Sequence, residues 1–256
     1  MTTTTNPFFS IIIPSCNPNI SSLAYCLQTI EIQSCNHWET IVIDALSPQS
    51  DAVRLECSRI KHTHFLVDME ASGVYPAINQ AIHASKGDWI LVLGHDDKLA
   101  NECVLQKVKN LIQKKRFLFW RQGYYGNVII DGNAGWANDG EIYAGKFNFG
   151  DLVTSNICHQ AIFYRGSSAR IKGREYSKEF KITSDWDCNI RAWTRGGMGY
   201  LPLVVSIFKG GGLSAFSGIR WVSWARGADL GLLGAESSFL VCVTFGCLLH
   251  IRIEVC

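Results

Sequence analysis

Residues 87–99 read Gly-Asp-Trp-Ile-Leu-Val-Leu-Gly-His-Asp-Asp-Lys-Leu, and this stretch constrains the fold more than any other. The apolar run 89–94 is typical of a central strand that is buried on both faces. Asp96 and Asp97 follow at its carboxyl end, where ligands bind in open α/β sheets. Two adjacent carboxylates there suit Mg²⁺ or Mn²⁺. The alternative is that they open a loop and cap a helix that begins near Asn101.

Composition narrows the classes of function. The 256 residues suffice for one large α/β domain, and 47% hydrophobic with 18% charged residues is the balance of a globular protein. With a net charge of +2 and scattered basic residues, we expect no nucleic-acid partner. The ten cysteines form no Cys-x-x-Cys pair, and the amino terminus has no basic region. We therefore expect a reduced, cytoplasmic protein without a secretory signal.

The first half of the chain alternates β-rich runs with segments of helical periodicity. Strands are expected at 8–13, 39–43, 64–67 and 89–94, and helices after Asn19, at 52–60, around Pro76 and at 101–113. This alternation predicts an α/β fold with a doubly wound, mostly parallel sheet. Polar residues that follow the strands should converge on one crevice; they are Ser15, Asn17, Asp44, Glu70, Asp96 and Asp97. The absence of GxGxxG and GxxxxGK[ST] argues against a dinucleotide-binding domain and a P-loop enzyme.

The second half has a different pattern. Residues 117–149 are rich in aromatic residues, glycine and asparagine, which favours antiparallel strands and turns. A helix is expected to begin at 183–187 and a further strand to cover 203–208. The glycines at 210–212 form either a lid that excludes water or an ordinary flexible turn.

Six motifs occur in a familiar order. They are FSIIIPSCN (9–17), ETIVIDALS (39–47), EASGVYPAINQAIHASKGDWILVLGHDDKL (70–99), SNICHQAIFYR (155–165), SDWDCNIR (184–191) and GGGLS (210–214). Together they resemble family-2 glycosyltransferases with the GT-A fold, and the last three resemble the branch that builds bacterial exopolysaccharides such as colanic acid. The resemblance covers roughly 8–216 and leaves 217–256 as a divergent hydrophobic tail.

The resemblance implies a nucleotide-diphosphate sugar as donor, with Mn²⁺ or Mg²⁺ on its diphosphate. Asp97, together with Asp96 through the ribose or a second-shell water, would hold the ion. The nucleoside would be held by Pro14, Ser15, Asn17 and Asp44, and the ribose–phosphate side by Glu70 and Gly73. The alternatives are a strand end with an Asx-turn at Asn17 and a plain turn glycine at Gly73.

On the acceptor side the resemblance makes Asp185 the general base, and the family's habit implies inversion at the anomeric carbon. Ser184 and Asp187 also resemble a capping box, a role compatible with Asp185 pointing into the cleft. His159 and Gln160 are expected on the acceptor floor near the diphosphate, with a hydrogen-bonded structural histidine as the alternative. Cys158 is not expected to form a dyad with His159, because neighbours on a strand face opposite ways.

The main hypothesis is thus an inverting, metal-dependent glycosyltransferase that acts on a saccharide or lipid-linked acceptor in cell-surface polysaccharide biosynthesis. Ala45 and Pro76 depart from the family's usual acidic residues and motivate the alternative, a catalytically inactive sugar-nucleotide-binding GT-A module. In the tail, the cleanest apolar run, 239–249, is about half of what a bilayer span requires. A docking segment is expected there, and peripheral contact with the inner face of the membrane is the second interpretation.

Overall fold

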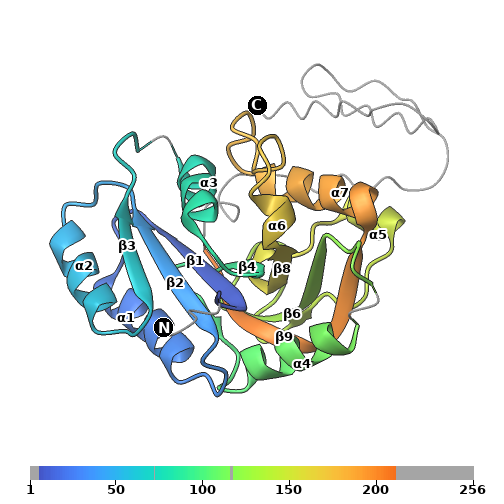
Figure 1. Ribbon diagram of the computed structural model, residues 1–256, viewed down its shortest axis with the longest axis horizontal. Helices are drawn as coiled ribbons and strands as arrows, with labels where there is room; N and C mark the ends of the chain where they lie inside the picture. The colour runs from blue at the N-terminus through green and yellow to red at the C-terminus, as the bar shows by residue number, and fades with distance from the viewer. Residues whose placement is uncertain (1–5, 72, 116–117, 212–256) are drawn as a thin grey trace. The chain divides into compact units, whose positions relative to one another are not determined.

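A computed structural model describes residues 6–71, 73–115 and 118–211. The first half alternates strands with helices in the order β1 (Phe9–Ser15), α1 (Ile20–Glu31), β2 (Trp38–Asp44), α2 (Ser50–Ser58), β3 (Thr63–Val67), α3 (Val74–Ala84) and β4 (Trp89–Val92). The four strands pair in parallel in the order β3-β2-β1-β4 (Figure 1). The predicted parallel α/β arrangement is confirmed.

The same sheet continues into the second half. The elements are β5 (Lys98–Leu99), α4 (Val104–Lys114), β6 (Gly123–Asp131), β7 (Ile142–Tyr143), α5 (Phe149–Thr154), the 3₁₀ turn η1 (His159–Ala161), β8 (Ile162–Arg165), α6 (Gly166–Ala169), α7 (Ser184–Gly196) and β9 (Met198–Lys209). Beyond β4 the order is β8-β6-β9-β5, and β7 pairs with β6. β8 is antiparallel to both neighbours, as expected for this half, but β6 and β9 pair in parallel. β9 begins at Met198, earlier than its apolar run suggests.

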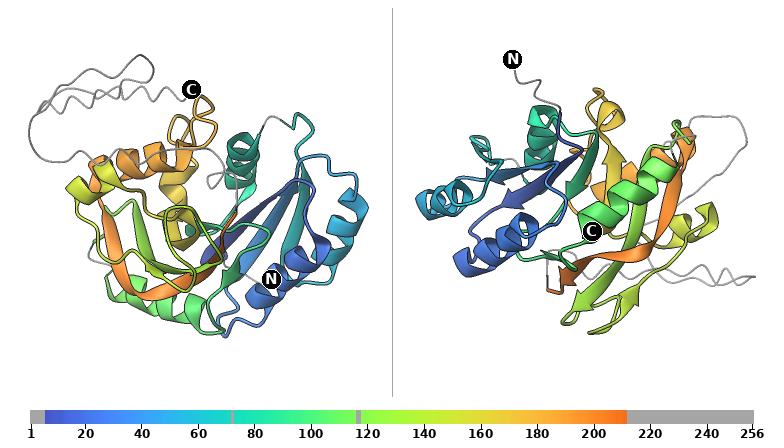
Figure 2. Two further views of the ribbon diagram at one scale, coloured as in Figure 1. Left: turned by 180° about the vertical axis from the view of Figure 1, so that it is seen from behind. Right: turned by 60° about the horizontal axis from the view of Figure 1, so that its bottom comes forward.

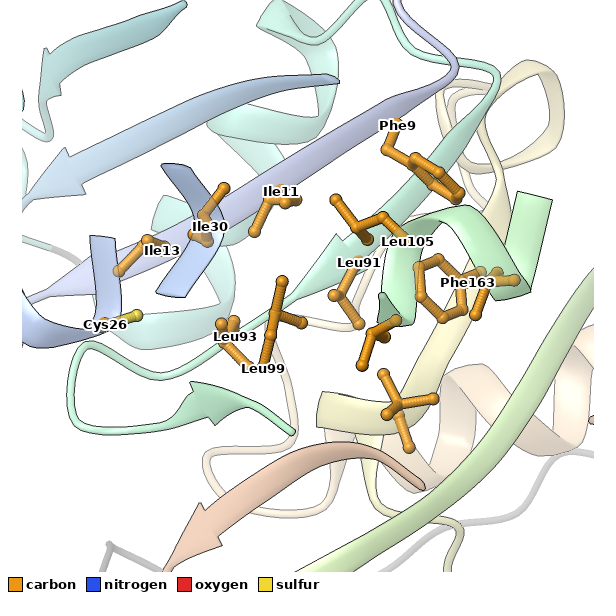
Figure 3. Close-up of a cluster of buried hydrophobic side chains, with 14 of the residues drawn as sticks. Phe9, Ile11, Ile13, Cys26, Ile30, Leu91, Leu93, Leu99, Leu105 and Phe163 are labelled. Atoms are coloured by element: carbon orange, nitrogen blue, oxygen red, sulfur yellow. The ribbon is translucent and has the colours of Figure 1, made fainter. Parts of the chain in front are cut away.

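Helices cover both faces of the sheet (Figures 1 and 2). Successive strand side chains point to opposite faces, so Ile11 and Ile13 of β1 join one core cluster and Ile12 joins the other. The first cluster, part of which Figure 3 shows, packs the strands against α1, α2 and α4. The second packs them against α3, α5 and α7. This double burial explains why β4 reads as a continuous apolar run.

The helix starts test several local predictions. Asn19 caps α1 by accepting a hydrogen bond of 3.0 Å from the Ser22 amide. Pro76 occupies the first turn of α3, where a missing N–H costs the helix nothing. Cys103 precedes α4, and β5 separates that helix from Asp97, so the aspartate pair does not cap it. The capping alternative for Asp96 and Asp97 is therefore wrong.

No helix within the described ranges combines the length and the apolar character that a bilayer span requires. The expectations for the hydrophobic tail 217–256, and for the glycine segment beyond Gly211, fall outside the described residues.

Candidate active site

The loops after β1 and β2 are tied together by Asp44. This side chain is fully buried at the end of β2. Its carboxylate accepts hydrogen bonds from the Ser15 hydroxyl at 3.2 Å, the Ser47 hydroxyl at 2.6 Å and the Ser47 amide at 2.9 Å. The Asn17 amide donates to the Ser47 hydroxyl at 2.7 Å, which brings the first loop against the second. Asp44 thus holds the loops and has no surface left for a ligand.

Each of the first three parallel strands is followed by a loop with one non-glycine residue at positive φ. These residues are Asn17 (φ 48°), Leu46 (φ 52°) and Ala71 (φ 44°). The left-handed region costs an L-residue about 1–2 kcal/mol, with asparagine the best tolerated. Strain of this kind persists where surrounding contacts impose it, and it gathers at binding sites. The three loops lie at one edge of the sheet, which marks that edge as a candidate ligand site.

Asp68, which follows β3, is a candidate that sequence reasoning missed. The residue is 5% exposed; its Oδ1 accepts the Glu70 amide, while no described group bonds to its Oδ2. A buried carboxylate oxygen without a partner is costly, so this atom is suited to a ligand N–H or O–H. The signal was present in the sequence, since Asp68 follows β3 much as Asp44 ends β2. Glu70 is instead exposed, and Gly73 precedes α3 with φ 116°.

The two carboxylates after β4 have different surroundings. Asp97 is 2% exposed, and its oxygens accept the Gly94 amide at 2.9 Å and the Lys209 amide at 2.8 Å. Asp96 is partly exposed, and no described residue donates a hydrogen bond to its carboxylate. Asp96 is therefore the more accessible of the two carboxylates, and Asp97 is bonded to the turn that carries it.

Burial raises the pKa of Asp97 to about 6, and the negative charge of Asp96 acts in the same direction. The two backbone N–H donors and the nearby His159 oppose that rise. The described residues contain no cluster of three His, Cys, Asp or Glu side chains that would hold an ion unaided. An ion at Asp96 would need oxygen ligands from a substrate, and oxygen ligands of that kind suit Mg²⁺.

Asp185 lies in the first turn of α7 at the centre of a hydrogen-bond network. The Tyr75 hydroxyl donates to its Oδ1 at 3.0 Å and the Asn156 amide to its Oδ2 at 2.7 Å. His159 Nδ1 lies 3.3 Å from the same Oδ2. The Ile182 carbonyl, just before α7, lies 2.5 Å from the same hydroxyl, so the single Tyr75 O–H is shared between this carbonyl and Asp185. Burial raises the pKa of Tyr75 far above its ordinary value, and the Asp185 charge adds to that rise, so the phenol stays a donor.

A chain of buried amides orients Asn156. The Tyr164 hydroxyl donates to Asn189 Oδ1 at 2.7 Å, so the Asn189 NH₂ faces Asn156 and donates to its Oδ1 at 2.8 Å. The Asn156 NH₂ is then directed at Asp185. Tyr75 and Asn156 were both missed from the sequence, because their part in the site depends on contacts across 110 and 29 residues of chain.

The expected capping box at the start of α7 is wrong. Thr183 is the residue before the helix and makes no side-chain cap, and the buried Ser184 hydroxyl has no hydrogen-bond partner among the described residues. Asp187 pairs with Arg191 at 2.8 Å instead. The predicted opening of the helix at this point is nevertheless correct, which places Asp185 at the positive end of the helix dipole.

Asp185 and His159 line a pocket of about 120 Å³. Its other polar residues include Asn156 and Gln160, and its aromatic wall consists of Trp136, Tyr143, Trp186 and Phe208. Gln160 is buried and accepts a hydrogen bond of 2.8 Å from the Cys158 thiol. Cys158 precedes the turn η1 and does not lie on a strand, so the alternation argument against a dyad does not apply; its bond to Gln160 shows where the thiol points.

The two halves of the site are close to each other. Burial raises the pKa of Cys158 well above its ordinary value, and the charges of both Asp97 and Asp185 add to the rise. His159 in turn lowers the pKa of Asp97 and lies next to Asp185. Asp97 and Asp185 therefore share two neighbours, Cys158 and His159, on whose side of the site both carboxylates act.

Comparison with known proteins places the chain in a family. The profile described as "Glycosyl transferase family 2" matches residues 10–171. The "PGL/p-HBAD biosynthesis glycosyltransferase" of Mycobacterium tuberculosis (strain H37Ra) is 32% identical over 215 residues, which cover 81% of this chain and 79% of that protein. The protein of the same name from Mycobacterium bovis (strain BCG) matches equally well. The chain belongs to glycosyltransferase family 2 and is a glycosyltransferase.

Solved structures show the same fold at low sequence identity. S. aureus TarS 1–349 superposes with a TM-score of 0.64 at 15% identity, covering 78% of this chain and 60% of that one. The complex of TarS 1–349 with UDP-GlcNAc gives 0.62 at 16% identity over 78% and 58% of the two chains. The mannosyltransferase PcManGT from Pyrobaculum calidifontis, in complex with GDP-Man and Mn²⁺, gives 0.55 at 14% identity over 80% and 57%. This chain spans about 60% of the TarS chain, and the fold is GT-A.

Proposed function

We propose that this glycosyltransferase is inverting and metal-dependent, and that it moves a sugar from a nucleotide-diphosphate donor to a saccharide or lipid-linked acceptor in the synthesis of cell-surface polysaccharide. The observation that carries the proposal is the position of Asp185. A partly exposed carboxylate, held by Tyr75 and Asn156, lines an aromatic pocket together with His159, which also acts on the buried Asp97 after β4.

On the donor side we assign the divalent cation to Asp96. The sequence placed it first on Asp97, but that carboxylate is 2% exposed and each of its oxygens accepts a backbone amide, whereas Asp96 is partly exposed. Mn²⁺ or Mg²⁺ on the diphosphate would neutralise the charge that develops on the leaving phosphate. The Mn²⁺ in the PcManGT complex with GDP-Man supports this choice of cofactor.

The nucleoside would lie against the loops after β1 to β3. Pro14, Ser15 and Asn17 would border the base, and Asp44 would hold these loops without touching it. The unpartnered Oδ2 of Asp68 would accept the base N–H, a contact that Ala45 cannot make. Glu70 and Gly73 remain our candidates for the ribose–phosphate side.

The chemistry assigned to Asp185 is general base catalysis in a single displacement. The acceptor hydroxyl oxygen attacks the anomeric carbon, the bond from that carbon to the phosphate oxygen breaks, and the hydroxyl proton passes to the carboxylate. Attack from the face opposite the leaving group inverts the anomeric centre. Positioned proton transfer of this kind contributes about 10²–10⁴-fold in rate.

The acceptor would occupy the pocket of Asp185 and His159. Its aromatic wall offers rings for packing against a sugar, and Asn156 and His159 offer polar atoms for hydroxyl groups. His159 and Gln160 would form its floor. An acceptor whose attacking hydroxyl is carried by a ring could pack that ring against the aromatic wall of the pocket.

A thermal-shift screen tests the donor half with the full chain. UDP and GDP, each with and without Mn²⁺, are compared for the wild type, Asp96→Asn and the control Asp51→Asn on the exposed side of α2. At 100-fold excess over its Kd a ligand of the folded state stabilises by about 2.7 kcal/mol, or about 5–10 °C for a chain of this size. We expect Asp96→Asn to lose only the Mn²⁺-dependent part of the shift. Equal shifts in all three proteins would contradict the assignment.

Hydrolysis of the donor sugar then separates enzyme from inactive binding module. Wild type that binds the nucleotide but neither hydrolyses nor transfers sugar, with a broad panel of acceptors, would favour the module. Mn²⁺-dependent hydrolysis that Asp96→Asn abolishes and Asp51→Asn retains would exclude it.

A further inference from the structure

Two large aromatic side chains are exposed side by side on the segment between α4 and β6. Phe119 is 74% exposed and Trp120 is 48% exposed. Their rings contact edge to face, with centroids 5.4 Å apart. Single exposed apolar residues are normal on protein surfaces, but an adjacent Phe–Trp pair places two rings together in water. Rings of this kind are favoured where an apolar and an aqueous phase meet.

The backbone of this pair is fixed at the carboxyl end of α7. The Gln122 amide donates to the Gly197 carbonyl at 3.1 Å, and its side chain donates to the Trp120 carbonyl at 2.8 Å. The Trp120 carbonyl in turn packs directly against Gly196, where a Cβ would not fit. The exposed rings therefore project from a held turn, and Asp185 lies near the other end of the thirteen-residue helix, about 17 Å away along the helix axis.

A small pocket with three arginines and one glutamate among its lining residues adjoins the turn. It has a volume of about 30 Å³, and its polar lining comprises Gln122, Arg165, Ser168, Arg174, Glu175 and Arg195. Arg174 donates to the Ser168 hydroxyl at 2.9 Å, and that hydroxyl donates to Gln122 at 2.6 Å, which links the pocket to the aromatic turn. Arg174 and Arg195 face one glutamate, because Arg165 lies over the Trp89 ring and donates its Nε to the Arg121 carbonyl. The space is large enough for about one oxygen atom.

Within the described part of the chain, the acids near these arginines have other partners. Glu175 accepts the Gly173 amide and lies 3.7 Å from His83, while Asp187 is engaged by Arg191. Partial burial lowers the pKa of Arg195, and the positive charges of Arg191 and Arg174 lower it further. The pocket therefore carries excess positive charge, which an anionic oxygen would relieve.

We propose that this surface, formed by Phe119, Trp120, Arg174 and Arg195 and here named the α7-end surface, binds an anionic phospholipid bilayer. The two rings would enter the interface, and lipid phosphate oxygens would meet the arginines. Charge favours this partner over a second copy of the chain, because a two-fold contact would bring the same arginines towards each other. The proposal does not depend on the reaction, since this surface lies at the far end of α7 from Asp185.

Vesicle co-sedimentation of the full chain tests it, with phosphatidylcholine alone and with phosphatidylcholine–phosphatidylglycerol mixtures. Phe119→Ser/Trp120→Ser removes the rings, and Ile32→Ser/Leu55→Ser is the control at two other exposed apolar residues. Arg174→Gln/Arg195→Gln removes the charge, with Lys61→Gln/Lys86→Gln as control. An unchanged melting temperature verifies that each variant folds. If one of the two double variants does not fold, the other still tests the proposal.

We expect wild type to bind the anionic vesicles, more weakly as salt rises, and to ignore the neutral ones. Each lost arginine should lower partitioning about fivefold, the change that corresponds to about 1 kcal/mol per charge at a membrane surface. Wild type that fails to bind, or variants that bind as well as their controls, would overturn the proposal. So would a dimer in sedimentation equilibrium that Trp120→Ser dissociates, since a second copy would then cover these rings.

Discussion

The Asp97 carboxylate accepts a hydrogen bond of 2.8 Å from the Lys209 amide, 112 residues later in the chain. The bond joins the turn after β4 to the end of β9, and the second oxygen of Asp97 holds the Gly94 amide within that turn. One buried carboxylate thus fixes the loop that carries Asp96 against the last described strand. We infer that Asp97 positions the loop that carries Asp96. Burying its carboxylate should also make the free energy of unfolding depend on pH.

The stability of the ligand-free protein should fall as pH rises through about 6. Burial raises the folded-state pKa of Asp97 to about 6, above the ordinary value of 3.8, so the folded state binds more protons between these values. The free energy of unfolding should therefore be higher at low pH, where Asp97 is protonated, by up to about 3 kcal/mol. This difference is lost as pH rises through the folded-state pKa and the buried carboxylate becomes charged. Urea unfolding at pH 5 and at pH 7.5 should show this slope in wild type.

Asp97→Asn should flatten that part of the pH dependence, because asparagine does not titrate. At pH 5 the variant and the wild type should differ little in stability, because the mostly protonated Asp97 carboxyl, like the amide of asparagine, has only one good acceptor oxygen for the two backbone donors. A variant with the wild-type slope would assign the pH dependence to another group.

Removing the Tyr75 hydroxyl should slow transfer without weakening donor binding. Tyr75→Phe leaves the ring but frees one side of Asp185, so we expect kcat to fall about tenfold, against about 10²–10⁴-fold for Asp185→Asn. The matched control is Tyr200→Phe, which loses a hydroxyl bonded to Asn127. Equal effects of the two phenylalanine variants, or a change confined to donor KM, would show that Tyr75 does not position the base.

Asp68→Asn should weaken nucleotide binding while the free protein stays as stable as wild type or becomes more so. The substitution removes a buried carboxylate oxygen that has no hydrogen-bond partner among the described residues. Loss of one charge-assisted contact to a base N–H corresponds to about 1.5–3 kcal/mol, or roughly 10- to 100-fold in Kd. Calorimetric titration of UDP and GDP measures it, with Asp51→Asn as control. Unaltered Kd values would show that Asp68 does not contact the base.

Gly87→Ala should destabilise the sheet where β4 begins. A Cβ at Gly87 would lie 2.5 Å from the Ser10 backbone nitrogen and 2.7 Å from the Phe9 carbonyl carbon, so β1 would have to move. Overpacking of this kind costs about 1–3 kcal/mol, or about 2–12 °C in Tm for a chain of this size. Gly150→Ala in α5 is the control, because there a Cβ meets only the Asn148 side-chain oxygen at 3.1 Å. Equal Tm values for both variants would contradict this packing argument.

Much of the parallel half was predictable from local pattern. The apolar run of β4, the helical spacing of α1 and the Asn19 cap all depend on residues close together in the chain, and the periodicity of side chains reports them directly. The same reasoning placed polar residues at the carboxyl ends of neighbouring strands. It failed at the start of α7, where Ser184 and Asp187 match a capping box but have other surroundings.

By itself the sequence determined the parallel sheet, the edge at which the polar residues gather, and the family, because all three follow from local periodicity and short motifs. Only the tertiary structure decided the surroundings of each carboxylate. Asp96 and Asp97 are neighbours with the same chemistry, yet the Lys209 and Gly94 amides bond to Asp97, and no group in the described part of the chain donates to Asp96. Asp185 likewise depends on Tyr75 and Asn156, which reach it from distant segments. Burial and hydrogen-bond partners arise from long-range packing, and local sequence does not encode them.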